Sequence, residues 1–277
     1  MIDLIHKSSK QQTILKSIKI NGVGLHSGIA VSLKLEPAEE NNGIKFIRTD
    51  LKNNNTINAI WSNVTATTLS TTISNKSGAK VSTIEHLMSA LSGLHIDNLN
   101  IYLDSSEVPI MDGSSKVFVD LIEKNGIKVQ NKNRKVLKVK KEIKVISKNS
   151  SVRLLPNKQF SIDFEIDFPS ILVNKQSCQL QLVNGNYKTD VASARTFGFE
   201  KDVENKEEVA ALKLAAGQKS RKAALLAEKA RLVAVSIQAL RGTTIAKVEA
   251  MRMANKEQQA LESPKQHEVE TTRSHCC

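Results

Sequence analysis

The first half of the chain alternates apolar and polar residues over short stretches, as half-buried β-strands do. In the stretch 29–35, IAVSLKL, every second residue is aliphatic and the residues between are small or charged. Comparable patterns occur at 14–20, 43–50 and 99–104, and the β-branched stretch 64–74 also favours a strand. This part of the chain is therefore predicted to be mainly β-strand.

Two segments among these strands show a helical period instead. In 82–93 the apolar residues recur at helical intervals up to Gly93, and Ser82 and Glu85 have the spacing of a capping box. The second segment, 114–126, begins with serine, carries an apolar stripe and ends with glycine, which is typical of a helix end. We expect a short helix at each place.

A second strand-rich segment follows the polar stretch 128–135, which is predicted to be a linker. In 160–168 apolar residues alternate strictly with polar ones, so one face of this strand is expected to be buried. Strands followed by helices, twice over, indicate an α+β protein with two similar two-layer domains of sheet and helix, the second one incomplete. The expected ranges are 1–128 for the first domain and 129–204 for the partial second domain.

The composition changes abruptly near residue 205. The stretch 205–277 is rich in alanine and other strong helix formers, and asparagine becomes rare. We expect a divergent tail that is helical or partly disordered. The tail is basic, but no aromatic residues stand among its basic ones, so nucleic-acid binding is not expected.

Composition and charge narrow the class of protein. The chain has 277 residues, 40% of them hydrophobic, and a net charge of +12, which would suit an anionic partner, although lysine-rich surfaces are also common without one. No apolar run is long enough for a membrane-spanning helix, and the N-terminus lacks the apolar segment of a secretory signal. Three cysteines form no disulfide framework, so the cytoplasm is the expected location.

Glu85 and His86 stand side by side early in the first predicted helix. Adjacent helical side chains diverge by about 100°, so these two would not hold one ion as the histidines of an H-E-x-x-H helix do. His86 could instead bind zinc while Glu85 takes a proton from the zinc-bound water. The alternative is a pair of solvated residues near a helix start, because one Glu-His dipeptide often occurs by chance.

Further motifs surround this pair in a characteristic order: GVGLHSG, TTLSTTIS, STIEHLMSALSGLHIDN, EVPIMDGSS and ARTFGF. Together they resemble the UDP-3-O-acyl-N-acetylglucosamine deacetylases of lipid A and lipopolysaccharide biosynthesis, over about residues 10–204. The segment from about residue 205 is not part of the resemblance. The resemblance implies a cytoplasmic hydrolase of lipid metabolism, a zinc amidohydrolase that removes the N-acetyl group from its substrate.

The resemblance, carried over motif by motif, implies roles for individual residues. Glu85 would be the general base and His86 a ligand of Zn²⁺, the expected cofactor. Thr196 would donate a hydrogen bond to the oxyanion of the tetrahedral intermediate. Phe197 would flank the bound sugar, and Leu69 would lie near the carbonyl group and the metal.

His26 and Asp112 also match motif positions, and we interpret both as structural residues or as support behind the site. The partner that the resemblance implies is a UDP-linked acylated amino sugar, whose acyl chain needs an apolar groove and whose UDP suits basic residues. The resemblance also allows peripheral contact with the inner-membrane surface, and a monomer is expected.

Some patterns of that family do not occur in the sequence. The family takes two more zinc ligands from an HKxLDxxGD helix and a catalytic histidine from a GHALNN-like stretch, and neither pattern is present. A catalytic zinc normally has three protein ligands, so a chain with His86 alone is expected to be impaired. His275, Cys276 and Cys277 form a weaker metal candidate. The alternative functions are a catalytically inactive binding or scaffold protein, or a frame-shifted fragment with a basic helical tail.

Overall fold

The computed structural model describes residues 10–135, 139–147, 150–168, 174–181 and 186–196. These residues form several β-sheets with a few short helices, so the mixed α+β class predicted from the sequence is confirmed. The predicted tail at 205–277 and the predicted site residue Phe197 lie outside the described residues. Within the described ranges, none of the helices has the length and apolar character that crossing a membrane requires.

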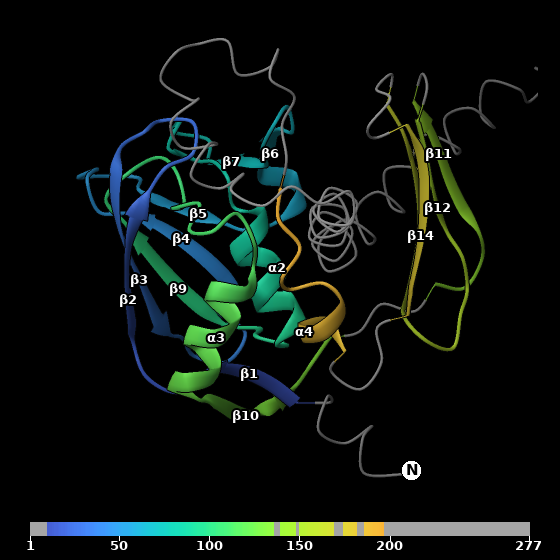
Figure 1. Ribbon diagram of the computed structural model, residues 1–277. Helices are drawn as coiled ribbons and strands as arrows, with labels where there is room; N and C mark the ends of the chain where they lie inside the picture. Colours follow the sequence, from blue (N-terminus) through green and yellow to red (C-terminus); the bar gives the residue numbers. More distant parts are fainter. Residues whose placement is uncertain (1–9, 136–138, 148–149, 169–173, 182–185, 197–277) are drawn as a thin grey trace, which may run out of the picture.

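A five-stranded sheet stands at the centre of the layered part of the structure (Figure 1). Its order is β2-β3-β9-β4-β5, and neighbouring strands are antiparallel except for β4 and β9, which are parallel. The strands are β2 (Ile18–Val23), β3 (Ala30–Pro37), β9 (Leu99–Leu103), β4 (Ile44–Arg48) and β5 (Thr56–Asn58). The alternation predicted at 29–35 is confirmed for Val31, Leu33 and Leu35 of β3, which are buried while the residues between them are not. It is wrong for Ile29, which precedes β3 and is 58% exposed.

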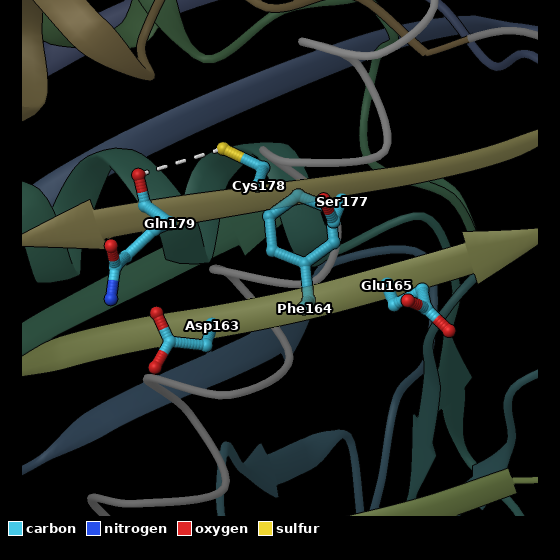
Figure 2. Close-up of a pocket in the computed structure, with 6 residues that line it drawn as sticks. All are labelled: Asp163, Phe164, Glu165, Ser177, Cys178 and Gln179. Carbon is cyan, nitrogen blue, oxygen red and sulfur yellow. Dashed lines mark hydrogen bonds between the residues drawn. The ribbon is translucent and has the colours of Figure 1, made fainter.

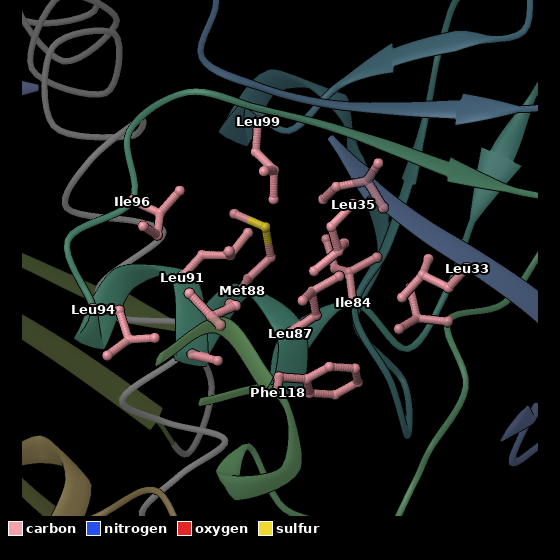
Figure 3. Packing of buried hydrophobic residues seen from close by; sticks show 14 of the residues in the cluster. Leu33, Leu35, Ile84, Leu87, Met88, Leu91, Leu94, Ile96, Leu99 and Phe118 are labelled. Carbon is pink, nitrogen blue, oxygen red and sulfur yellow. The ribbon is translucent and has the colours of Figure 1, made fainter. Parts of the chain in front are cut away.

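Two helices, α2 (Glu85–Gly93) and α3 (Lys116–Asn125), pack on the apolar side of this sheet (Figure 1). Figure 3 shows their contact with it: Leu87 and Leu91 of α2 belong to one buried cluster with Leu33 of β3 and Phe118 of α3. All four side chains are fully buried. Because burying one such side chain contributes about 1.5–3 kcal/mol, this cluster holds α2 firmly against the sheet.

The helix starts differ from the sequence prediction, whereas a helix end agrees with it. The capping box of Ser82 and Glu85 is wrong, since Ile84 precedes the first turn of α2 and no side chain caps it. The backbone N–H of Ser82 instead donates to the carbonyl of Ser106 at 2.9 Å, in a bridge outside the helix. The glycine predicted to end the second helix is confirmed, because Gly126 follows α3 with a φ of 91°.

The stretch predicted as one strand at 64–74 consists of two strands. They are β6 (Val64–Ala66), which follows a short 3-10 turn, η1 (Trp61–Asn63), and β7 (Thr72–Ser74). The strand β7 pairs with β6 on one side and with β8 (Lys80–Val81) on the other. Leu69 lies between β6 and β7 with a φ of 60°, a value that turns the chain and interrupts an extended strand. The β-branched composition of 64–74 favours a strand over the whole stretch, but composition does not show that Leu69 adopts a left-handed backbone conformation.

The linker predicted at 128–135 is also wrong. Residues Ile127–Asn133 form β10, which pairs antiparallel with β1 (Lys10–Ile14). Gln130 of β10 is buried and accepts a hydrogen bond from the Asn98 side chain at 2.7 Å, while its own amide donates to the Ala38 carbonyl at 2.9 Å. Because the buried residue of β10 is polar, the hydrophobic pattern of the sequence does not reveal this strand.

Two β-hairpins stand apart from the five-stranded sheet in Figure 1. One joins β11 (Ile143–Ser147) to β12 (Ser150–Leu154), and the other joins β13 (Ser161–Asp167) to β14 (Lys175–Gln181). The buried face predicted at 160–168 is confirmed for Ile162 and Ile166, although Phe160 remains 37% exposed.

A last short helix, α4 (Tyr187–Asp190), packs on α2 and α3. The Tyr187 ring lies so close to Gly93 that a Cβ on that glycine would overlap ring atoms. The Tyr187 hydroxyl forms hydrogen bonds with the Ser89 hydroxyl at 2.6 Å and the Ser115 hydroxyl at 2.8 Å. These contacts fasten the segment 186–196 to the helical layer.

Candidate active site

Glu85 and His86 are the first two residues of α2, and both are buried, with exposed fractions of 4% and 5%. The alternative that this pair is solvated at a helix start is therefore wrong. A carboxylate and an imidazole seldom become buried without partners, because removing polar groups from water is costly. The start of a helix also favours a negative charge, through the unpaired N–H groups of its first turn.

The Glu85 carboxylate is held by the loop between β6 and β7. The backbone N–H of Thr71 donates to Oε2 of Glu85 at 2.9 Å, and the N–H of Ile84 donates back to the Thr71 carbonyl at 3.4 Å. Thr71 itself is buried. The TTLSTTIS motif, which contains Thr71, is thus hydrogen-bonded to the STIEHLMSALSGLHIDN motif, which contains Glu85.

Leu69 lies two residues before Thr71 in the same loop. Its side chain is 55% exposed, although leucine is usually buried, and its φ of 60° is uncommon for a residue other than glycine. The hydrogen bond from Thr71 to Glu85 keeps this loop beside the helix start. The structure therefore brings the loop that contains Leu69 beside Glu85.

Thr196 and the loop containing Asp112 also meet. The Thr196 N–H donates to the Gly113 carbonyl at 2.9 Å, and a guanidinium nitrogen of Arg195 lies 3.6 Å from a carboxylate oxygen of Asp112. The other carboxylate oxygen of Asp112 accepts from the N–H and the hydroxyl of Ser114, at 3.0 and 2.8 Å. Asp112 thus shapes the turn before α3, which agrees with its interpretation as a structural residue.

Sequence reasoning missed Glu107, a buried carboxylate with 1% exposure. Its oxygens accept hydrogen bonds from the backbone N–H groups of His26 (3.0 Å) and Ser27 (2.9 Å) and from the Thr83 hydroxyl (2.8 Å). Burial by itself would raise the pKa of Glu107, but these hydrogen bonds, with one from the Ser27 hydroxyl, lower it below its ordinary value. The available signal was an acidic residue directly before the apolar VPI stretch of the EVPIMDGSS motif.

His26 contributes a backbone group to this arrangement. Its N–H donates to Glu107, and its side-chain Nε2 is enclosed within the protein. The GVGLHSG loop therefore wraps around the Glu107 carboxylate, which supports the structural role predicted for His26.

A complete zinc site is not formed by the described residues. Among them there is no group of three or more His, Cys, Asp or Glu side chains arranged to hold a metal ion. His86 is the predicted ligand within the described part of the chain, and Glu85 is engaged with Thr71. The second metal candidate, His275 with Cys276 and Cys277, lies outside the described residues.

An open pocket of about 340 Å³ lies on the hairpin of β13 and β14, with Asp163, Phe164, Glu165, Ser177, Cys178 and Gln179 around it (Figure 2). The Cys178 thiol donates to the Gln179 carbonyl at 3.7 Å, and Glu165 pairs with Lys175 at 3.0 Å. Histidine is absent from this lining, and the hairpin stands apart from α2 (Figure 1). We therefore assign no chemistry to this pocket.

Comparison with known proteins points to the same deacetylase family as the sequence motifs. The family model described as UDP-3-O-acyl N-acetylglycosamine deacetylase matches residues 11–239, a range that continues past the last motif near residue 204. Every residue of the Glu85 and Glu107 arrangements lies within that range.

Curated relatives carry the name UDP-3-O-acyl-N-acetylglucosamine deacetylase. The protein from Syntrophus aciditrophicus is 42% identical over 219 residues, which are 79% of this chain and 68% of the relative. The proteins from Shewanella pealeana and Pseudoalteromonas atlantica are 43% and 44% identical over 196 and 197 residues, about 70% of this chain and 64% and 65% of theirs.

The chain thus spans about two thirds of the length of these relatives. The match still covers most of the chain, and it includes the buried pair at the start of α2 and the loops that hold it. On these grounds the chain belongs to the UDP-3-O-acyl N-acetylglycosamine deacetylase family.

Proposed function

We propose that this protein removes the N-acetyl group from a UDP-linked 3-O-acyl-N-acetylglucosamine, a step of lipid A biosynthesis. The observation that carries the proposal is the buried Glu85 carboxylate, held by the Thr71 N–H beside His86 in a chain of this family. The relatives are named for that substrate and reaction, which supports the assignment.

Glu85 is the proton acceptor in this proposal. One of its oxygens, Oε2, is oriented by the Thr71 N–H, so the other oxygen can take a proton from the attacking water and pass it to the leaving amine. Positioned acid–base groups of this kind contribute about 10²–10⁴-fold to a rate.

Thr196, Leu69 and Phe197 are proposed to serve the substrate. The Thr196 hydroxyl donates to the oxyanion that forms as the amide is attacked, an interaction that strengthens in the transition state. Leu69 lies near the amide carbonyl and presents an exposed apolar side chain on a loop joined to Glu85. Phe197 flanks the sugar.

His86 is proposed to be a zinc ligand, with an affinity lower than that of a complete site. The described residues supply one predicted ligand, whereas a catalytic zinc normally has three from the protein. We therefore propose slow turnover for this chain. The proposed arrangement of domains is unchanged from the sequence: 1–128, a partial second domain at 129–204 that includes both outlying hairpins, and a tail at 205–277.

The purified full chain tests the proposal through acetate release from the UDP-linked acylated sugar, together with its zinc content. We expect acetate release that increases with added zinc, and zinc well below one ion per chain without it. His86→Gln should abolish the zinc response, whereas the control His95→Gln should keep it, because His95 is exposed beyond the end of α2.

The possible outcomes separate the alternatives. Stoichiometric zinc with fast turnover would overturn the impairment and leave the deacetylase assignment intact. Neither turnover nor a zinc response would overturn the deacetylase assignment and favour the catalytically inactive binding protein or the frame-shifted fragment.

A further inference from the structure

Glu107 joins two segments that are far apart in the sequence. On one side its carboxylate accepts the backbone N–H groups of His26 and Ser27, from the loop after β2, at 3.0 and 2.9 Å. On the other side it accepts the hydroxyl of Thr83 at 2.8 Å. Thr83 stands two residues before Glu85, so this hydrogen bond reaches the entry to α2.

Thr83 has an unusual backbone conformation. Its φ is 56°, which is rare for a β-branched residue and requires support from the surrounding structure. The residue is buried at 2% exposure, and its hydroxyl donates to Glu107. The direction in which the chain leaves Thr83 determines where Ile84 and Glu85 begin the helix.

The backbone on both sides of this hydrogen bond is also fixed. The N–H of Ser82 donates to the Ser106 carbonyl at 2.9 Å, and the N–H of Val108 donates to the Ser82 carbonyl at 3.1 Å. These bonds hold the neighbours of Thr83 and Glu107 side by side, which keeps the two side chains within hydrogen-bond distance. A Cβ on Gly24 would lie 2.5 Å from Oε2 of Glu107, so the glycine at this position leaves the space that the carboxylate occupies.

We propose that Glu107 is a positioning residue for the Glu85–His86 pair, acting through Thr83 on the start of α2. The described donors to its carboxylate are neutral hydroxyl and backbone N–H groups, so the ionised carboxylate is the form that satisfies all of them at once. The role in catalysis rests on the proposed deacetylase function, whereas the effect on the helix start does not.

Thr83→Val tests the proposal most directly, because valine keeps the branched shape and lacks the hydroxyl. We expect kcat to fall about 10- to 100-fold with little change in KM, since displacing a reacting group by about 1 Å can lower a rate by 10²-fold. Thr83→Ser keeps the hydroxyl that donates to Glu107 and should therefore retain a kcat close to that of the wild type. Glu107→Gln should lower kcat as Thr83→Val does.

Amide hydrogen exchange supplies a second measurement that does not depend on activity. The Met88 N–H donates to the Ile84 carbonyl at 2.9 Å in the first turn of α2. Its exchange should accelerate in Thr83→Val and Glu107→Gln, while the Leu33 amide in the central sheet should keep its wild-type rate. Asp104→Asn is the matched control, because Asp104 accepts the Ser32 N–H at 2.8 Å on the sheet.

Two results would overturn the positioning role. One is wild-type kcat and Met88 exchange in both variants. The other is equal acceleration at Met88 and Leu33, which would mean that Glu107 stabilises the whole fold without a particular effect on α2. If the wild-type chain shows no turnover, the proposed function fails, and Met88 exchange still decides whether Glu107 positions the helix start.

Discussion

At the residue scale, the Glu85 carboxylate combines burial with a directed hydrogen bond from the Thr71 N–H at 2.9 Å. The motif order in the sequence predicted Glu85 and His86 and the loop that contains Leu69. It did not predict Glu107, because a buried acid held by backbone N–H groups has no hydrophobic period. Only coordinates show that His26, Ser27 and Thr83 all donate to it.

Replacing Glu85 with glutamine should remove the proposed proton transfer without disturbing the structure around it. The amide oxygen of glutamine can still accept the Thr71 N–H, so the structure should persist, but the side chain can no longer take a proton. We expect kcat for acetate release to fall by about 10²–10⁴-fold. Glu36→Gln, on the half-buried outer side of β3, is the control and should retain wild-type kcat. Equal kcat in Glu85→Gln and the wild type would rule out Glu85 as the base.

Tyr187 links alkaline stability to the packing of α4. Burial raises the pKa of Tyr187 from 10.0 to about 12, although its hydrogen bonds with Ser115 and Ser89 act to lower it. Because the folded state keeps the phenol neutral, the stability from this group is fully present below pH 10 and is lost as the pH rises from 10 through about 12.

Tyr187→Phe should remove that alkaline loss and lower the free energy of unfolding at pH 7 by about 1–2 kcal/mol, because two hydrogen bonds disappear. Urea unfolding of both proteins between pH 7 and 12 measures the two effects. A variant with the same pH dependence as the wild type would show that Tyr187 does not titrate as described.

At the element scale, the sequence predicted the strands that alternate and the two helices that cover them. The strand 29–35 was predictable because Val31, Leu33 and Leu35 face a core. The polar strand β10 was not, because its buried residue, Gln130, is held by amide hydrogen bonds. The break between β6 and β7 was missed because a single φ at Leu69 makes it.

At the contact between α2 and α4, two opposing effects act on the stability change caused by Gly93→Ala. Glycine to alanine inside a helix ordinarily stabilises it by about 1 kcal/mol. At Gly93 the added Cβ would overlap the Tyr187 ring, so Gly93→Ala should destabilise the protein by about 1–3 kcal/mol in urea unfolding.

The same substitution behaves differently once the ring is gone. In a Tyr187→Ala background, Gly93→Ala should become neutral or stabilising, because nothing remains for the methyl group to overlap. A destabilisation of equal size in both backgrounds would mean that α4 does not pack on Gly93.

At the scale of the whole molecule, a chain that spans about two thirds of its relatives' length contains Glu85, the proposed base, His86, the proposed zinc ligand, and the loop that holds Glu85. The net charge of +12 suits an anionic UDP-linked substrate, since basic surfaces concentrate anions. Both features are compatible with the proposed deacetylation of a UDP-linked substrate.

The proposed deacetylation can be measured as acetate release from UDP-3-O-acyl-N-acetylglucosamine by the purified full chain across a range of zinc concentrations. We expect a rate above the protein-free background that increases with zinc and stays below that of the Syntrophus aciditrophicus relative assayed in parallel. A rate that remains at the background level at every zinc concentration would contradict the proposed deacetylation.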